Sequence, residues 1–359
     1  MSDRTVLALD AHGGDQGLAV SVPAALAALA EDPSLEIILV GNRAELEPAL
    51  ESALATSGGA AESRLRILHA SSSIAMDAKP AAVLRRGRDS SLWKAFELVA
   101  SQEAAACVSG GSTTALMVVG VKLLGMLPGI QRPALMGYLP NGRTRANGES
   151  GGDAGADGYT GMLDLGANLN VSARQLAQFA VMGAVTAREV EGIGEPRIGL
   201  LNVGHEESKG HEIVQQAHDL LLRLPINYAG FIEGNDIFAG TVDVAVCDGF
   251  AGNLVLKSSE GLARMLMGEF RKALHRNAVS RAGALLAGPS LRRMVAHLDP
   301  AAHNGAPLLG LNGVAIKSHG SSDCRGMTRA IVEAGREARR QVHRRIEASI
   351  REYRLETSA

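Results

Sequence analysis

Short, continuously apolar runs recur along the chain, and most of them end in a turn rich in glycine and small polar residues. The run VLALD at 6–10 precedes AHGGD, AACV at 105–108 precedes SGGSTT, and GVAIK at 313–317 precedes SHGSSD. Apolar runs of this length that do not alternate with polar residues suit strands buried on both faces of a parallel sheet. Because helix-length segments such as 18–30 and 173–190 separate the runs, the sequence predicts a doubly wound α/β fold with a largely parallel sheet.

Composition agrees with a folded chain of many turns. Glycine makes up 42 of the 359 residues, above the usual share of about 7%. A hydrophobic content of 46%, only 12 prolines and no Gly-X-Y period exclude a collagen and argue against global disorder. A net charge of −2 and an aromatic content of 3% argue against a nucleic-acid partner.

We expect a soluble, cytoplasmic protein. The N-terminal segment MSDRTVLALD has neither the basic nor the apolar region of a signal peptide. The longest apolar stretch, 115–130, is interrupted by Lys122 and Pro128 and is too short to span a membrane. The three cysteines lack C-x-x-C spacing and are predicted to be reduced thiols.

The common nucleotide and metal motifs are missing. Gly192 and Gly194 are followed by Arg197 where a dinucleotide fingerprint needs its third glycine, and no P-loop pattern occurs. The segment HEESKGH at 205–211 has Lys209 where a zinc-binding H-E-x-x-H needs its second histidine. We therefore expect no metal and no cofactor.

The segment GGSTT at 110–114 allows two interpretations. It nearly matches the G-x-S-x-G nucleophile elbow, but Thr114 replaces the last glycine. It also suits a helix N-terminus whose backbone amides and hydroxyl groups bind a phosphate.

Several strand ends together favour an anion site. Turns rich in amide N–H and hydroxyl groups occur at Gly13-Gly14, 109–113, 249–253 and 318–322, and Lys209, Lys257 and Lys317 supply positive charge. In a doubly wound fold such turns meet at the carboxyl edge of the sheet, so the pattern predicts a site for phosphate or a phosphorylated group. Four acidic residues at strand ends are expected to cap helices or turns: Asp10, Asp15, Asp164 and Asp248.

Three segments fall outside this strand and helix pattern. Residues 142–161 contain seven glycines and are predicted to form a flexible surface loop. Residues 261–298 predict a basic amphipathic pair of helices broken near Gly288-Pro289. From about Met327 one long charged helix is expected. The domains are accordingly a catalytic α/β unit over 1–330 and a C-terminal charged helix over 331–359.

At its strand ends the chain resembles the bacterial acyl-carrier-protein:phosphate acyltransferases, the PlsX-type fatty acid and phospholipid synthesis proteins. The similarity runs in order from about residue 5 to 335. The matching segments are LDAHGGD (9–15), RDSSLWKA (88–95), LDLGAN (163–168), LLNVGHEESKG (200–210), IEGNDIFAG (232–240), VCDGFAGN (246–253) and LDPAAHNGAPLLGLNGVAIKSHGSSD (298–323). The chain departs from the family's usual Met, Asn, Gly, Glu and Asn at His12, Ser112, Thr114, His205 and His211.

The resemblance implies transfer of a fatty acyl group from acyl-carrier protein to inorganic phosphate, giving an acyl phosphate for phosphatidic acid and phospholipid synthesis. It also implies a fold like that of the phosphotransacetylases and the isocitrate dehydrogenase-like group, usually in a homodimer. The chemistry needs positioning of phosphate and stabilisation of an oxyanion more than it needs a strong base, because a thioester is already activated. Two rival functions are a short-chain phosphotransacylase using acyl-coenzyme A and a non-catalytic scaffold that binds carrier protein or membrane.

Candidate residues follow from the turns and the matching segments. The catalytic candidates, expected around the oxyanion or the pantetheine thiolate, are Lys209, Asn202, Ser112, Asp248 and Asn253. The phosphate-binding candidates are Ser318, Gly320, Ser321, Ser322, Lys257, Lys317, Gly13 and Gly14. Contact with the acidic carrier protein, or peripheral contact with the inner surface of the cytoplasmic membrane, is expected at Arg264, Arg271, Lys272, Arg292 and Arg293. Packing of this helical pair on the body or in a dimer interface is the alternative.

Overall fold

The computed structural model describes residues 4–57, 62–143, 158–298 and 304–355. These residues form an eleven-stranded sheet in the order β3-β2-β1-β4-β11-β10-β5-β6-β9-β7-β8. The strands are β1 (Thr5–Asp10), β2 (Leu35–Gly41), β3 (Leu65–His69), β4 (Ala106–Ser109), β5 (Ala134–Pro140), β6 (Tyr159–Leu163), β7 (Ile198–Leu201), β8 (Tyr228–Ile232), β9 (Val244–Val246), β10 (Ala306–Leu309) and β11 (Val314–Lys317). The α-helices are α1 (Leu18–Glu31), α2 (Arg43–Ser57), α3 (Pro80–Arg86), α4 (Ser91–Ala100), α5 (Thr113–Leu123), α6 (Ala173–Glu189), α7 (Glu212–Leu221), α8 (Gly234–Ala239), α9 (Gly249–His275), α10 (Ala278–Leu298), α11 (Cys324–Arg340) and α12 (Val342–Glu352).

The sheet consists of two parallel blocks joined by antiparallel strands. The first block is β3-β2-β1-β4-β11, and the second block is β6-β9-β7-β8. Between them, β10 pairs antiparallel with β11 and β5, and β5 pairs antiparallel with β6. The predicted doubly wound, largely parallel α/β fold is confirmed.

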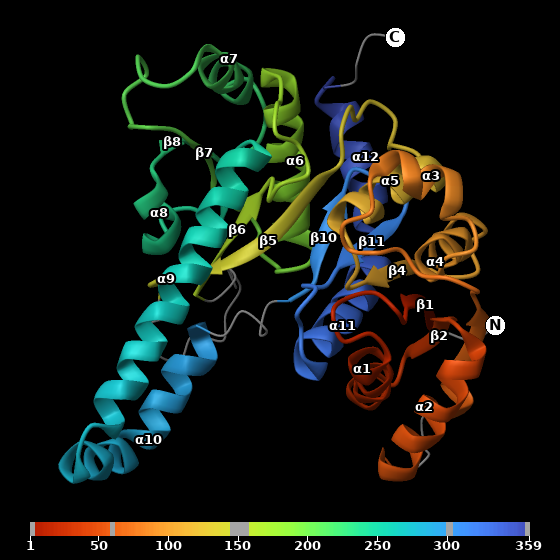
Figure 1. The fold of residues 1–359 in the computed structure, drawn as a ribbon. Helices are drawn as coiled ribbons and strands as arrows, with labels where there is room; N and C mark the ends of the chain where they lie inside the picture. The colour runs from red at the N-terminus through yellow and green to blue at the C-terminus, as the bar shows by residue number, and fades with distance from the viewer. Residues whose placement is uncertain (1–3, 58–61, 144–157, 299–303, 356–359) are drawn as a thin grey trace.

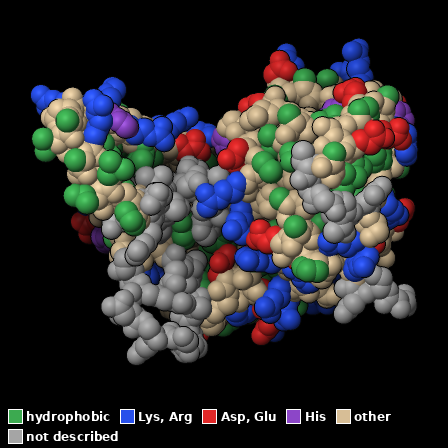
Figure 2. All heavy atoms as spheres, turned by 90° about the horizontal axis from the view of Figure 1, so that it is seen from below, with side chains coloured by type: hydrophobic (Ala, Val, Ile, Leu, Met, Phe, Trp, Pro, Cys, Tyr) green, Lys and Arg blue, Asp and Glu red, His purple; other side chains and the backbone are tan. Residues whose placement is uncertain are grey.

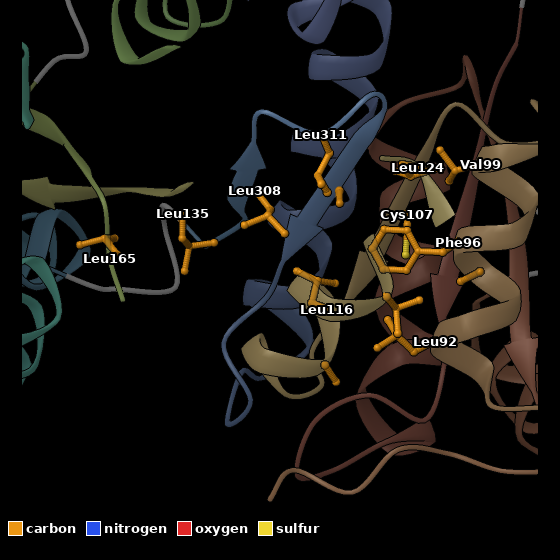
Figure 3. Packing of buried hydrophobic residues seen from close by; sticks show 14 of the residues in the cluster. Leu92, Phe96, Val99, Cys107, Leu116, Leu124, Leu135, Leu165, Leu308 and Leu311 are labelled. Atoms are coloured by element: carbon orange, nitrogen blue, oxygen red, sulfur yellow. The ribbon is translucent and has the colours of Figure 1, made fainter. Parts of the chain in front are cut away.

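Helices cover both faces of each block. In the first block, α1 and α11 pack together on one face, while α4 and α5 pack on the other. In the second block, α6 contacts both α7 and α12. One apolar cluster continues across the junction of the blocks, from Leu116 on α5 through Leu308 on β10 to Leu135 on β5 (Figure 3).

Helices α9 and α10 form an antiparallel arm that projects away from the sheet (Figure 1). The sequence places the break between these helices at Gly288-Pro289, and this is wrong. The helices separate near Asn277, whose Oδ1 accepts the backbone N–H of Ser280 at 2.8 Å and so caps the start of α10. Pro289 lies inside α10.

Other differences from the sequence predictions concern segment ends and short elements. The single C-terminal helix is two helices, because Gln341 adopts a left-handed conformation between α11 and α12. Tyr159–Gly161, expected in the flexible loop, belong to β6; residues 144–157 of that loop lie outside the described residues. The sequence patterns do not indicate β8, β10, α3 and α8, which are short or follow a turn directly.

Candidate active site

Three neighbouring strands end side by side at the carboxyl edge of the first block. Asp10 at the end of β1 is in register with Ser109 at the end of β4, and Ser109 is in register with Lys317 at the end of β11. The turns that follow these strands are rich in glycine, in hydroxyl groups or in both. The register therefore brings together residues that are far apart in the sequence.

Asp10 is a buried carboxylate that joins two serine hydroxyl groups. Ser91 Oγ donates to its Oδ1 at 2.5 Å, and Ser109 Oγ donates to its Oδ2 at 2.6 Å. The Gly111 backbone N–H in turn donates to Ser109 Oγ at 3.0 Å. Burial raises the pKa of Asp10, and the serine hydrogen bonds oppose that rise. Asp10 also accepts a hydrogen bond from the backbone N–H of His12, so it caps the turn after β1 as expected, while its serine partners lie on other elements.

The turn after β1 lies against the turns after β4 and β11. A Cβ on Gly13 would lie 2.6 Å from Asp10 Oδ2 and 2.8 Å from the Gly111 nitrogen, so only glycine fits there. Gly14 has a φ of +96°, and the next residue, Asp15, donates its backbone N–H to the Gly320 carbonyl at 2.8 Å. Gly13, Gly14 and Gly320, all predicted to bind phosphate, therefore lie together.

Lys317 lies beneath these turns with only 8% of its surface exposed. Its Nζ donates to the Gly110 carbonyl at 3.3 Å and also to the Ser318 carbonyl. Burial is the main cause that lowers its pKa to about 8, and the nearby Lys257 lowers it further, whereas Asp15 raises it. Lys317 is thus a cation that a bound anion would help to keep protonated.

Asn304 holds the turn after β11 in place. Its Nδ2 donates to Ser318 Oγ at 2.7 Å and to Ser322 Oγ at 2.9 Å, and its Oδ1 accepts the backbone N–H of His319 at 2.9 Å. Asn304 and His319 belong to a segment that matches the family, but no sequence pattern indicates a role for either residue. The only sequence signal for them was their place in that segment.

Helix α9, which follows β9 of the second block, reaches the turn after β11. Asp248 caps the helix, as expected, by accepting the Ala251 N–H at 2.8 Å. Eight residues beyond Gly249, at a rise of 1.5 Å each, the helix has advanced about 12 Å. There Lys257 pairs with Glu260 at 3.1 Å, and its Nζ lies 3.4 Å from His319 Nε2.

A second turn lies beside the start of α9. Asp164 Oδ1 accepts the N–H groups of Leu135 and Ala167, and its Oδ2 accepts the Asn168 N–H at 2.7 Å. The expectation that Asp164 caps a turn is confirmed by these bonds. A Cβ on Gly166 would lie 3.4 Å from the side chain of Asn253, so this catalytic candidate lies against the turn.

The remaining catalytic candidates lie in two other places. Asn202 Nδ2 donates to the carbonyls of Gly204 and Lys209, both at 3.1 Å, and Lys209 Nζ pairs with Glu206 Oε1 at 2.7 Å in the loop after β7. Among the described residues, neither of these two side chains is hydrogen-bonded or ion-paired to a phosphate-binding candidate. Ser112 instead caps α5 by accepting the Ala115 N–H at 3.4 Å.

These contacts do not support the interpretation of GGSTT as a nucleophile elbow. Within the described part of the chain, no histidine is hydrogen-bonded to Ser112, and a serine nucleophile needs an adjacent base. The start of α5 instead presents backbone amides beside the turn after β1.

The arm of α9 and α10 carries exposed basic and apolar side chains. Arg264 and Lys272 are exposed, the latter paired with Glu269 at 2.7 Å, and Arg271 is exposed beside them. Leu285 and Leu286 are 81% and 86% exposed. Figure 2 shows basic side chains interspersed with hydrophobic ones on this projection. The side chains of Arg292 and Arg293 lie outside the described residues.

A depression of about 740 Å³ lies at the opposite edge of the sheet, at the amino ends of β1 and β4. Its polar lining includes Arg4, Arg339 and Arg344, each of which is already paired with a carboxylate. The candidate active site is the carboxyl edge instead, because ligands of doubly wound folds bind there. None of the described helices is long and apolar enough to cross a membrane.

The fold is that of the phosphotransacetylases. A phosphotransacetylase from Streptococcus pyogenes superposes with a TM-score of 0.58 at 18% identity, covering 93% of this chain and 94% of that one. The EutD phosphotransacetylase from Staphylococcus aureus gives a TM-score of 0.54 at 14% identity, covering 94% and 95%.

The chain belongs to the fatty acid synthesis protein family, whose model matches residues 5–345. A phosphate acyltransferase of Alkalilimnicola ehrlichii is 45% identical over 97% of this chain and 96% of its own length. A phosphate acyltransferase of Nitrosococcus oceani is 46% identical over 96% of both chains. The resemblance stated from the sequence is confirmed, and the chain is an enzyme of the acyltransferase class.

Proposed function

We propose that the enzyme transfers a fatty acyl group from acyl-carrier protein to inorganic phosphate, giving an acyl phosphate for phospholipid synthesis. The observation that carries this proposal is the convergence of three strand-end turns around Asp10, Ser109 and Lys317. Backbone amides, hydroxyl groups and a buried ammonium group are suited to a small, doubly charged anion. Membership of a fatty acid synthesis family supports a long acyl chain as the group transferred.

In the proposed reaction, an oxygen of hydrogen phosphate attacks the thioester carbonyl carbon. The C–O bond forms, the C–S bond breaks, and the proton of hydrogen phosphate passes to the departing thiolate. The products are acyl phosphate and the free thiol of the carrier protein, so no oxidant, reductant or metal is consumed. Phosphate would be held by the turn of Ser318, Gly320, Ser321 and Ser322 with Lys257, Lys317, Gly13 and Gly14.

We further propose that the catalytic candidates of the second block act on the other half of the substrate. Lys209 and Asn202 would approach the carbonyl oxyanion or the thiolate from the loop after β7, and Asp248 and Asn253 would orient the start of α9. A preorganised donor at a developing oxyanion lowers the activation free energy by about 3–4 kcal/mol. Ser112 would contribute through the backbone amides of the helix that it caps.

The test measures phosphate-dependent thiol release, with long-chain acyl-carrier protein and acetyl-coenzyme A offered side by side. We expect Lys209→Ala and Ser321→Ala to lower turnover at least tenfold, and Lys122→Ala, an exposed lysine on α5, to leave it unchanged. Near-normal turnover in both site variants would refute the residue assignment. Preference for acetyl-coenzyme A would favour the short-chain transacylase, and no turnover with either donor would favour the scaffold.

We propose the basic arm as the place of contact with the acidic carrier protein or an anionic membrane surface, in a cytoplasmic homodimer. Its exposed arginines and apolar side chains supply the charge and the surface that either partner needs. Charge reversal at Arg264 and Arg271 should raise the KM for acyl-carrier protein if the carrier binds there. It should instead abolish co-sedimentation with anionic vesicles if the membrane does, and unchanged values of both would count against the arm. Analytical ultracentrifugation tests the dimer.

A further inference from the structure

The side chain of His319 has a defined pattern of donors and acceptors. Its Nδ1 lies 2.9 Å from Ser321 Oγ and accepts the Ser321 backbone N–H at 3.3 Å. An amide N–H can only donate, so Nδ1 is the unprotonated nitrogen and the ring proton lies on Nε2. Burial and the positive charges of Lys257 and Lys317 lower the pKa of His319, which keeps the ring neutral near pH 7.

The Nε2–H group faces a second donor. Lys257 Nζ lies 3.4 Å from Nε2, and an ammonium group has no acceptor. Lys257 is held in this position by Glu260, at 3.1 Å and 3.3 Å from its two carboxylate oxygens. One acceptor oxygen placed about 2.9 Å from both nitrogens would receive a hydrogen bond from each of these two donors.

We propose that His319 is a further phosphate-binding residue, whose Nε2–H and the Lys257 ammonium group donate to the same phosphate oxygen. This inference rests on the proposed function for its ligand. The position of the ring is fixed from two sides, since the His319 backbone N–H donates to Asn304 Oδ1 at 2.9 Å and Nδ1 bonds Ser321. Lys317 lies at the base of the same turn.

The test compares two amides that each replace one half of the imidazole. In His319→Gln the terminal amide nitrogen takes the place of Nε2 and retains the donor. In His319→Asn the amide takes the place of Nδ1 and the donor to phosphate is lost. Because a hydrogen bond to a charged group is worth about 1.5–3 kcal/mol, we expect the KM for phosphate to rise about tenfold or more in His319→Asn. It should stay within about threefold of the parent in His319→Gln, and kcat should change less than KM.

A double-mutant cycle with Lys257→Met tests whether the oxygen is shared. The effects of His319→Asn and Lys257→Met on the KM should be less than additive if both donors bind one oxygen. An unchanged KM in His319→Asn, or equal increases in the Asn and Gln variants, would overturn the proposal.

The same variants can be tested without an acyl donor, by the increase in melting temperature that inorganic phosphate produces in the full-length protein. Loss of this increase in His319→Asn, together with its retention in His319→Gln, supports the inference even if no acyl phosphate is formed. Normal acyl transfer with an unaltered phosphate response in His319→Asn would refute the inference while leaving the proposed function intact.

Discussion

The buried lysine at the end of β11 predicts a specific pH dependence of phosphate binding. The lowering of its pKa from 10.5 to about 8 corresponds to a cost of about 3 kcal/mol for the protonated form. The protonated form is the one that attracts phosphate. Below pH 7 nearly all Lys317 is charged, at pH 8 half is charged, and above pH 8 the charged fraction falls tenfold per pH unit.

The affinity for phosphate should therefore fall as pH rises through 8. If only the protonated form binds, the KM for phosphate at pH 9 is about ten times that at pH 7. Asp10, Asp15 and Lys257 face the ammonium group, and the two carboxylates raise its pKa while Lys257 lowers it. Lys257→Met should consequently move the inflection to a higher pH, although it also weakens binding.

The assay is phosphate-dependent thiol release at varied phosphate between pH 7 and 9.5, corrected for hydrolysis without enzyme. Lys317→Arg is the matched variant, because a guanidinium stays protonated throughout this range and should remove the inflection. Its melting temperature reports whether the larger side chain is tolerated, and Lys257→Met provides the independent measurement if it is not. A KM that stays constant from pH 7 to 9.5 in the parent enzyme would refute the assignment.

Three further substitutions, with Gly268→Ala as a control, test the packing of the site by thermal unfolding and by turnover. Asp10→Asn should destabilise the protein by about 1–3 kcal/mol and reduce turnover, because the amide replaces one acceptor oxygen with a donor that faces a serine. Gly13→Ala should cost about 1–3 kcal/mol through a clash with Asp10, whereas Gly268→Ala, in open space on α9, should stabilise by about 0.5–1 kcal/mol. Asp248→Ala should cost about 1 kcal/mol through loss of the α9 cap. Equal melting temperatures for Gly13→Ala and Gly268→Ala, or for Asp248→Ala and the parent, would contradict these assignments.

Local sequence patterns predicted the regular elements because those elements depend on nearby residues. The apolar runs and the glycines that follow them gave the ends of β1, β4 and β11 to within a residue, and with them the turns that we propose bind phosphate. Short elements such as β10 were missed because four residues carry too little periodicity to identify a strand.

Contacts between distant segments could not be predicted in this way. The serine partners of Asp10 lie 81 and 99 residues away, and their approach depends on strand order and register. The contact of Lys257 with His319 depends on the direction of α9 from the second block. The contacts of Asn304 with the turn after β11 likewise could not be predicted, because they depend on where the residues just before β10 lie.

The position of β11 has a consequence for how the chain is made. This strand lies between β4 and β10, yet it is synthesised about two hundred residues after β4. Until residue 317 has left the ribosome, β4 is the exposed edge of a four-stranded sheet, with unpaired backbone groups open to another chain. A truncated or stalled product would retain that edge and lack Lys317. The strand that completes the proposed phosphate site is thus also the one that protects the nascent sheet from aggregation.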